Sequence, residues 1–220
     1  MKSTPGTSNS ESKTICIFGG AFNPPQLAHV GTMLELLDHP ATERIIILPS
    51  GNRADKSFGI EAVHRVGMIQ AMVDHLIQIK GDRVSVDWYF LEHPEIETTT
   101  RNEYAHVRSK CGERVSHVFG SDVLEAMTTW WDLDAGVGES TLFVAQEVPK
   151  TIVIRAGYEI IPESVQAKLA NVQNIITLQH PSEISSTQIR NPATTIEELY
   201  KLVPETVAQY IIQNRLYHFL

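Results

Sequence analysis

A glycine pair between an apolar run and an amphipathic segment is the feature that most constrains how this chain can fold. Residues 14–18 form a short apolar run, as expected for a buried parallel strand. Gly19 and Gly20 follow directly, and residues 26–38 then carry apolar side chains at helical spacing. A strand that enters a helix through glycines can bring backbone N–H groups close to a ligand. The free N–H groups and the positive end of the helix dipole then favour an anion at this bend.

The polar residues around this bend suit an anion site. Asn23 is expected to cap the helix, and Pro24 fits its first turn, where a missing N–H costs nothing. Gln26 and His29 are three residues apart, so both can face the bend. The alternative is a plain strand-to-helix connection with a capping or surface histidine. This segment alone does not decide between the two interpretations.

A second segment that favours anions lies far downstream. Ser185, Ser186 and Thr187 follow an apolar run at 174–178, and they offer hydroxyls and free N–H groups at a helix start. Arg190 comes three residues after Thr187, and its planar guanidinium can bind phosphate oxygens through two parallel hydrogen bonds. The alternative is a helix cap followed by a solvated arginine. Together, the two segments favour one shared phosphate site.

Short apolar runs alternate with amphipathic stretches along the chain. Strands are expected at Thr14–Phe18, Glu43–Leu48, Arg83–Val86, Arg114–Phe119, Thr141–Val144 and Asn174–Leu178. Helices are expected at about 26–38, 60–78, 98–110, 162–170 and 204–214. This alternation predicts an α/β fold, in which a doubly wound parallel sheet is covered on both faces and joined by right-handed crossovers. Ligands of such sheets bind beyond the carboxyl ends of the strands, at the switch point.

Length and charge limit the classes of function. The 220 residues suit one large domain over 14–220, and residues 1–13 are expected to be a flexible tail, not a signal peptide. The net charge of −8 argues against a partner that is a nucleic acid polymer or an anionic membrane. No apolar run approaches the ~18 residues of a membrane span. Cys16 and Cys111 lack metal-ligand spacing and suit a reducing cytoplasm.

The two anion-binding segments resemble the paired motifs of a known family. Residues 19–29 read Gly-Gly-Ala-Phe-Asn-Pro-Pro-Gln-Leu-Ala-His, and residues 184–190 read Ile-Ser-Ser-Thr-Gln-Ile-Arg. They are similar to the G-x-F-[DN]-P-x-[HT]-x-x-H and I-S-S-T-x-I-R patterns of the nicotinate/nicotinamide mononucleotide adenylyltransferases, in the nucleotidyltransferase superfamily. The resemblance extends over about residues 14–217. It implies a single Rossmann-like nucleotidyltransferase domain.

The resemblance also implies a reaction in NAD biosynthesis. AMP would pass from ATP to nicotinate or nicotinamide mononucleotide, giving deamido-NAD or NAD and pyrophosphate. Catalysis of such a transfer is mostly positioning and neutralisation of phosphate charge. The implied partners are ATP and a pyridine mononucleotide, and the implied cofactor is Mg²⁺ held through the ATP phosphates, with no metal-ligating side chains. A homo-oligomer is compatible with the sequence.

The same resemblance implies roles for individual residues. His29 is expected to be the main donor to the reacting phosphates, and Arg190 to bind the β- and γ-phosphates; these two are the implied catalytic residues. The implied ATP-binding residues are Gly19, Gly20, Phe22, Gln26, His29, Gly120, Asp122, Ser185, Ser186, Thr187 and Arg190. The implied mononucleotide-binding residues are Asn23, Lys56, Thr99, Trp130, Trp131 and Arg155. For Lys56 the alternative is a solvated loop charge, and for the tryptophans it is burial under a loop.

Two positions depart from the family pattern. Gln26 stands where the family has His or Thr, and its amide gives a neutral hydrogen bond about half as strong as a charge-assisted one. Weakened or altered phosphate binding is therefore expected. Residues 97–102 match only loosely the Ser/Thr-rich segment that contacts the nicotinate ring in the family. Two alternatives stay open: a member that binds nucleotide without turnover, and a sister transferase with another acceptor such as phosphopantetheine.

Overall fold

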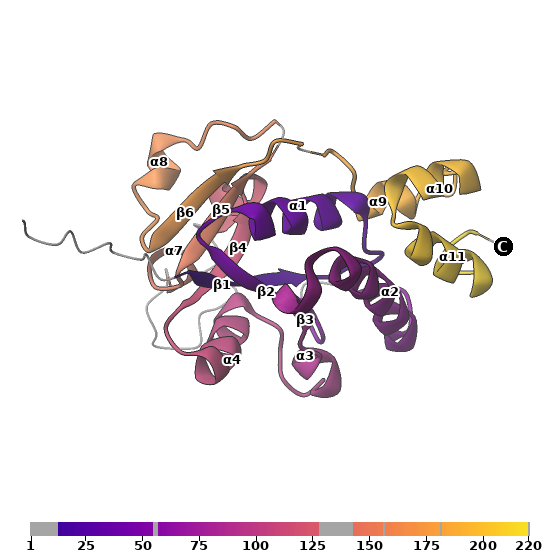
Figure 1. Ribbon diagram of the computed structural model, residues 1–220, viewed down its shortest axis with the longest axis horizontal. Coiled ribbons are helices and arrows are strands. Elements are labelled where there is room, and N and C mark those ends of the chain that lie inside the picture. The colour runs from indigo at the N-terminus through magenta and orange to yellow at the C-terminus, as the bar shows by residue number, and fades with distance from the viewer. Residues whose placement is uncertain (1–12, 55–56, 128–142, 156, 181, 220) are drawn as a thin grey trace, which may run out of the picture.

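The computed structural model describes residues 13–54, 57–127, 143–155, 157–180 and 182–219. Within these residues, six parallel strands form one sheet in the order β3-β2-β1-β4-β5-β6 (Figure 1). The strands are β1 (Thr14–Gly20), β2 (Thr42–Pro49), β3 (Val84–Val86), β4 (Val115–Gly120), β5 (Lys150–Ile154) and β6 (Val172–Thr177). The helices are α1 (Leu27–Asp38), α2 (Ala62–Lys80), α3 (Tyr89–Glu92), α4 (Thr100–Cys111), α5 (Leu124–Met127), α7 (Phe143–Gln146), α8 (Glu163–Gln166), α9 (Ser186–Ile189), α10 (Ile196–Leu202) and α11 (Glu205–Gln213).

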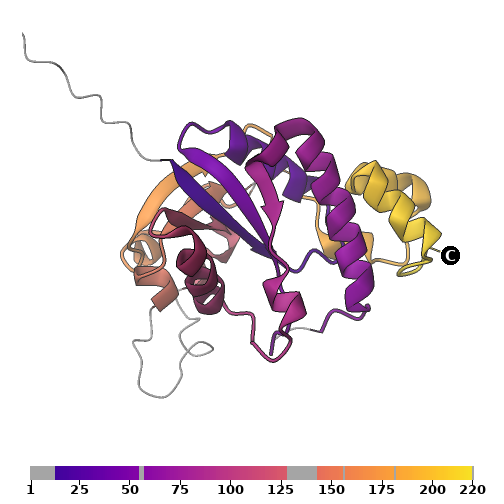
Figure 2. The same cartoon turned by 60° about the horizontal axis from the view of Figure 1, so that its bottom comes forward.

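The strand order reverses next to β1. The chain moves outward from β1 to β2 and β3, returns to β4 on the other side of β1, and continues to β5 and β6. Helices α1 and α2 lie on one side of the sheet and α3 and α4 on the other, as the two views in Figures 1 and 2 show. The predicted doubly wound α/β fold is confirmed. Its switch point lies at the carboxyl ends of β1 and β4.

Alternating side chains of the central strands supply two separate cores. Cys16 and Phe18 pack with the apolar side chains of α1, α2 and α11. Ile15 and Ile17 point to the opposite face and pack with the side chains of α3 and α4, including the fully buried Phe90. A strand whose successive residues are all buried in this way needs the continuous apolar run seen in the sequence.

The C-terminal helices pack against α2 and reach back to the loop after β1. Helix α11 contacts α2 at Gly67, where a Cβ would lie 2.2 Å from the Tyr210 ring. Beyond α11, the Tyr217 hydroxyl donates a hydrogen bond to Asn23 Oδ1 over 2.7 Å. The end of the described chain therefore helps to fix the first loop of the sheet (Figure 1).

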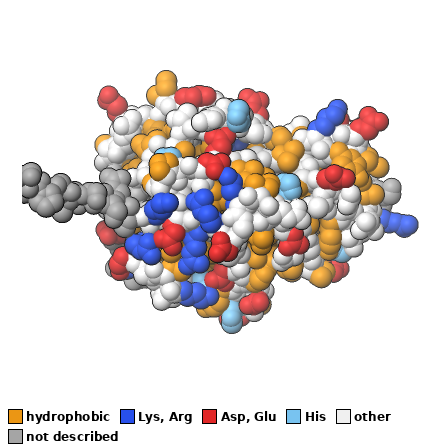
Figure 3. All heavy atoms as spheres, viewed as in Figure 1, with side chains coloured by type: hydrophobic (Ala, Val, Ile, Leu, Met, Phe, Trp, Pro, Cys, Tyr) orange, Lys and Arg blue, Asp and Glu red, His pale blue; other side chains and the backbone are white. Residues whose placement is uncertain are grey.

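Charged side chains of both signs share the surface. In Figure 3, Lys and Arg side chains gather left of centre, with Asp and Glu side chains beside them. Exposed ion pairs show the same mixing, for example Arg114 with Glu43 and Lys80 with Asp38, both at 2.5 Å. Among the helices of the described residues, none combines the length and the apolar character that crossing a membrane requires.

One predicted strand is wrong. Phe143 and Val144 lie in helix α7, and residues 141–142 lie outside the described residues. Short apolar runs suit a helix as well as a strand, so the sequence pattern alone could not separate the two. The strand beside β4 is instead β5, which begins at Lys150. A charged residue at the start of a buried strand breaks the apolar pattern by which such strands are predicted. The burial of Lys150 costs little because its Nζ donates hydrogen bonds to Val148 O (2.5 Å) and Ala170 O (2.9 Å).

The buried Lys150 makes stability depend on pH in a definite direction. Burial lowers the pKa of Lys150 from 10.5 to about 8, so between these values the unfolded chain binds a proton that the folded chain does not. The free energy of unfolding of the wild type, relative to that of Lys150→Met, should therefore rise with pH over this window by up to about 3 kcal/mol. Urea unfolding of both proteins at pH 8 and pH 10.5 measures this. A difference that stays constant would contradict the buried position.

Candidate active site

A cavity of about 360 Å³ opens at the switch point of the sheet. It is the region in which the sequence placed the ligand. The predicted site residues that line the cavity are Gly19, Gly20, Gln26, His29, Gly120, Asp122 and Arg155. Other side chains in its lining were not predicted, among them Ser50, Arg53, Glu103, His117, His180 and Ser182.

His29 offers the cavity a neutral hydrogen-bond donor. The backbone N–H of Gln26 donates to His29 Nδ1 over 3.2 Å, so the proton of the neutral ring lies on Nε2. Burial of the ring, and secondarily the positive charge of Arg155, lower the pKa of His29 to about 4. At neutral pH the side chain therefore presents an uncharged Nε2–H donor.

Two aromatic side chains hold the His29 ring in place. The ring meets Phe22 edge to face with centroids 5.0 Å apart, and it meets Phe18 in the same manner at 6.4 Å. Phe22 is fully buried, and its φ of 46° lies in the left-handed region that bulky residues seldom adopt. Phe22 was predicted to contact ATP; here its ring supports the imidazole and is not among the side chains lining the cavity.

Gln26, and not Asn23, caps helix α1, which corrects the expected helix start. Gln26 Oε1 accepts a hydrogen bond from Ala28 N over 2.7 Å, and Nε2 donates to Ile184 O over 2.9 Å. Both ends of this buried amide thus bind other parts of the protein. The residue that departs from the family pattern links the first loop to the second predicted phosphate segment.

Further hydrogen bonds join these two distant segments. Ser186 Oγ donates to Pro24 O over 2.9 Å, and Arg190 Nη1 donates to Asn23 O over 2.5 Å. Arg190 Nη2 also reaches Thr187 Oγ1 at 3.2 Å, and Ser185 caps α9 as expected. The prediction that residues 23–29 and 184–190 meet in the folded protein is confirmed. Ser185, Ser186, Thr187 and Arg190 lie outside the cavity lining, which they adjoin through Gln26.

Asn23 is the residue on which several segments converge. Its Nδ2 donates to Phe58 O over 2.6 Å, while its Oδ1 accepts from the Tyr217 hydroxyl and its carbonyl accepts from Arg190. The side chain predicted to contact the mononucleotide is thus buried and bonded within the protein. Its role in this structure is to fix the loop that precedes His29.

Arg65 is a buried cation that sequence reasoning missed. Its guanidinium donates to Ala21 O (2.9 Å) and Ser50 O (2.6 Å), which ties together the loops after β1 and β2. Burial lowers the pKa of Arg65 to about 10, so it stays charged at neutral pH. A signal existed: Arg65 falls three and four residues before Met68 and Ile69, on the apolar face of α2.

Asp122 and Arg155 form a partly exposed pair in the cavity wall. Arg155 Nη1 lies 3.3 Å from Asp122 Oδ2, and Arg155 N donates to Ser121 Oγ over 3.0 Å. A Cβ at Gly120 would come within 2.2 Å of Asp122 Oδ1, so the close approach requires glycine there. Within the described residues, Asp122 Oδ1 is buried without a hydrogen-bond partner. A ligand hydroxyl or amino group could satisfy this acceptor.

Glu103 and His117 form a second, deeply buried pair in the same wall. Glu103 Oε2 lies 2.8 Å from His117 Nε2, and the two side chains are 7% and 5% exposed. His117 was expected to be packed, and it is: its ring stacks on Phe119 with centroids 4.6 Å apart. Glu103 was missed, although it stands one residue before the apolar face of α4 at Tyr104 and Val107.

Of the remaining predicted site residues, Thr99 lies within the described part of the chain. Thr99 Oγ1 caps α4 by accepting from Asn102 N over 3.2 Å. Its neighbour Thr98 accepts from Gly51 N over 2.9 Å and so holds the loop after β2. Lys56, Trp130 and Trp131 lie outside the described residues.

The sequence matches the cytidylyltransferase-like family over residues 17–192. Two similar proteins are named probable nicotinate-nucleotide adenylyltransferase. The one from Rubrobacter xylanophilus is 26% identical over 205 residues, covering 91% of this chain and 90% of that protein. The one from Acholeplasma laidlawii is 26% identical over 204 residues, covering 92% and 97%.

Solved structures share the fold. The Plasmodium falciparum nicotinic acid mononucleotide adenylyltransferase complexed with NaAD superposes with a TM-score of 0.76 at 23% identity, covering 94% of this chain and 98% of that one. The same enzyme complexed with APC gives a TM-score of 0.73 at 22% identity, with the same coverage.

The protonation of His29 can be measured directly. Because Nδ1 accepts a hydrogen bond and the surrounding protein desolvates the ring, we expect long-range ¹H–¹⁵N NMR spectra to show the neutral Nε2–H form until the pH falls to about 4. The His29→Gln variant identifies the signal, which should disappear. A transition near the unperturbed value of about 6.5 would show that the ring is not held as described.

The two bonds of Gln26 can be separated by substitution. Gln26→Ala removes the helix cap and the bond to Ile184, so it should lower the free energy of unfolding by about 1–2 kcal/mol. Gln26→Glu keeps the acceptor for Ala28 N, loses the donor to Ile184 O and adds a negative charge to the cavity wall. Urea unfolding and ATP binding should be measured for both, and the Glu variant should bind ATP more weakly than the wild type. Unchanged stability in Gln26→Ala would refute the linking role.

Proposed function

The chain belongs to the cytidylyltransferase-like family of nucleotidyltransferases, and we propose that it transfers AMP from ATP to a pyridine mononucleotide, either nicotinate or nicotinamide mononucleotide, with release of pyrophosphate. The observation that carries this proposal is the joining of residues 23–29 to residues 184–190 beside one cavity at the switch point. The names of the similar proteins and the fold shared with solved adenylyltransferases support it.

The reaction needs positioned donors and no nucleophilic side chain. A 5′-phosphate oxygen of the mononucleotide attacks the α-phosphorus of ATP, a new P–O bond forms, and the bond from that phosphorus to the oxygen it shares with the β-phosphate breaks. The His29 Nε2–H donates to a non-bridging phosphate oxygen and strengthens as charge develops there. Because its pKa is low, His29 does this as a neutral donor over the physiological pH range.

ATP occupies the part of the cavity next to β5, β6 and α9 in this proposal. Asp122 Oδ1, the buried acceptor, receives a hydrogen bond from a ribose hydroxyl or from the adenine amino group. Ser185, Thr187 and Arg190 bind the β- and γ-phosphates, and the guanidinium is already oriented by Asn23 O. Gly19 and Gly20 let the phosphates approach the backbone at the end of β1.

The mononucleotide occupies the opposite part, next to the end of β2 and to α4. Ser50 and Arg53, which follow β2, line the cavity there, across β1 from Asp122 and Arg155 in the strand order. Glu103 of α4 lies beside Gly19 at the end of β1 and binds His117 of β4. Arg155 lies close enough to His29 to affect its pKa, so it can neutralise the phosphate that attacks. The further mononucleotide contacts proposed from the sequence are those of Lys56, Thr99, Trp130 and Trp131. Asn23, whose side-chain amide is bonded to Phe58 O and Tyr217, contributes in this proposal through the loop that it fixes.

Mg²⁺ fits this site as an ion carried by the ATP phosphates. Among the described residues, no group of three or more His, Cys, Asp and Glu side chains could hold a metal ion. The two carboxylates that line the cavity, Glu103 and Asp122, are each bonded to a basic side chain. Bound to phosphate oxygens and retaining its waters, Mg²⁺ would supply positive charge against the triphosphate.

The reaction can be tested by measuring pyrophosphate release with Mg²⁺ and ATP. We expect release with nicotinate or nicotinamide mononucleotide, and none without an acceptor. Phosphopantetheine as the acceptor and CTP as the donor test the related transferases. Turnover only with one of these, or tight nucleotide binding with no turnover, would overturn the proposal.

Substitution of His29 tests its assigned role. His29→Ala should lower kcat by about 10²–10³-fold, which is the scale for loss of one donor to a developing oxyanion. His29→Gln retains a neutral N–H donor and should keep more activity than His29→Ala. His75→Ala, which changes a histidine outside the cavity lining, is the matched control. Near-normal kcat in His29→Ala would remove the imidazole from the mechanism.

A further inference from the structure

A buried carboxylate forms part of the cavity wall without a role in phosphate binding. Glu103 is 7% exposed at its side chain and lines the cavity between Gly19 and His117. A Cβ on Gly19 would lie 3.0 Å from both Glu103 oxygens and 3.2 Å from His117 Cε1, so the pair is in near contact with the glycine strand end. Glu103 Oε2 binds His117 Nε2 over 2.8 Å, and Oε1 is the other oxygen of the same carboxylate.

The pair presents a hydrogen-bond acceptor whichever partner holds the shared proton. His117 Nδ1 must donate to Val118 O at 3.2 Å, because a carbonyl can only accept. One further proton lies between His117 Nε2 and Glu103 Oε2, which are 2.8 Å apart. With that proton on nitrogen the pair is an imidazolium and a carboxylate, and with it on oxygen both groups are neutral. In both cases the net charge of the pair is zero, and Oε1 can only accept.

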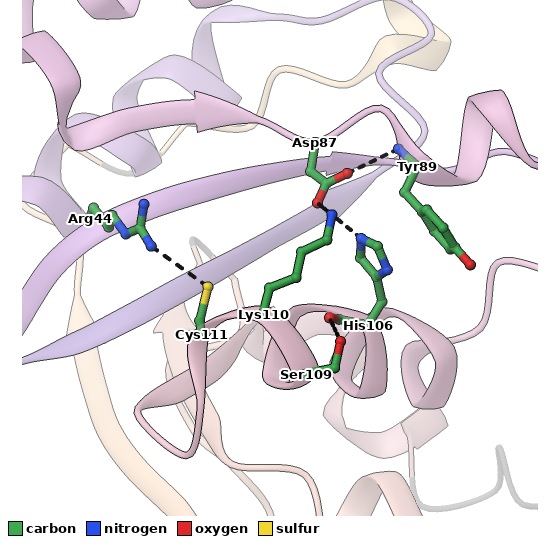
Figure 4. Close-up of polar contacts among 7 residues, drawn as sticks. All are labelled: Arg44, Asp87, Tyr89, His106, Ser109, Lys110 and Cys111. Carbon is green, nitrogen blue, oxygen red and sulfur yellow. Dashed lines mark hydrogen bonds and ion pairs between the residues drawn. The ribbon is translucent and has the colours of Figure 1, made fainter.

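The helix that carries Glu103 is fixed at a position away from the cavity. Asp87, which follows β3, accepts hydrogen bonds from His106 Nε2 (3.0 Å) and Lys110 Nζ (2.9 Å) of α4 (Figure 4). The His106 ring stacks on Tyr89 with centroids 3.8 Å apart. Figure 4 shows these side chains meeting between α4 and the end of β3. These contacts fix the position of α4, and the bond to His117 holds the Glu103 carboxylate against the cavity wall.

We propose that Glu103 selects the acceptor and makes nicotinamide mononucleotide the preferred substrate over nicotinate mononucleotide. This inference rests on the proposed function, in which the mononucleotide occupies the part of the cavity beside α4. A ring carboxamide has two N–H donors and can bind Oε1. A ring carboxylate has none, so it would place its oxygens against an acceptor that cannot rotate away and cannot supply a proton. A site built to receive a donor rejects an analogue that lacks one.

The test compares both mononucleotides in the wild type and in Glu103→Gln. For the wild type we expect kcat/KM to favour nicotinamide mononucleotide by ~10–100-fold, and the ratio of dissociation constants, measured by calorimetry, to show the same direction. A glutamine at 103 has nearly the same size, and its amide can turn either its oxygen or its NH₂ towards the ligand. The preference should therefore fall towards one in Glu103→Gln. Glu92→Gln removes a carboxylate from an exposed position of α3 and should leave the preference unchanged.

The outcomes separate this inference from the proposed function. Equal use of the two mononucleotides by the wild type, or preference for the nicotinate form, overturns the inference and leaves adenylyl transfer in place. A preference that persists in Glu103→Gln also overturns it. If neither compound is turned over, the proposed function fails, but tighter binding of nicotinamide mononucleotide that is lost in Glu103→Gln still supports the role of Glu103. If neither compound binds, both proposals fail.

Discussion

The site depends on hydrogen bonds that bind the carbonyl groups of one loop to cations and hydroxyls from distant segments. Residues 21–24 carry no regular structure, and their carbonyls would point into the protein without partners. Arg65 binds Ala21 O, Arg190 binds Asn23 O, and Ser186 binds Pro24 O. All three donors lie far from this loop in the sequence. The loop can therefore form only when α2, α9 and the sheet have all assembled, which couples the site to the complete fold.

At the position that departs from the family pattern, Gln26 takes part in the same set of hydrogen bonds. Gln26 was predicted to donate a neutral hydrogen bond to phosphate, and in this structure its amide accepts from Ala28 N and donates to Ile184 O. In the proposed reaction the donor to phosphate is His29, whose Nδ1 accepts from the Gln26 backbone N–H and whose ring packs against Phe22 and Phe18. A donor with one tautomer and one orientation needs little reorganisation when a phosphate arrives.

The sequence predicted the parts of the site that local patterns encode. The parallel sheet, its switch point and the meeting of the two segments followed from apolar runs, glycines and the Ser-Ser-Thr segment. Charged side chains whose roles depend on tertiary contacts were missed, namely those of Arg65, Glu103 and Lys150. Arg65 and Lys150 bind backbone carbonyl groups and Glu103 binds His117, and none of these partners can be inferred from local sequence. Asn23 was predicted to cap α1, whereas Gln26 is the cap and the Asn23 amide binds Phe58 O and Tyr217, which no local spacing reveals.

Two acid–base pairs in the cavity wall add no net charge to the cavity. Glu103 is balanced by His117 and Asp122 by Arg155, while His29 is neutral at physiological pH. In the proposed function, the charge of a triphosphate is met by Arg53 in the lining, by Arg190, by the positive end of α1 and by cations that arrive with the substrate. The charges of a close ion pair cancel at a distance, so such a pair does not distinguish ligands by their net charge. It can distinguish them at close range by whether the ligand donates or accepts a hydrogen bond. An acceptor fixed in the wall, such as Glu103 Oε1, can distinguish a carboxamide from a carboxylate for this reason, even though the net charge of its pair is zero.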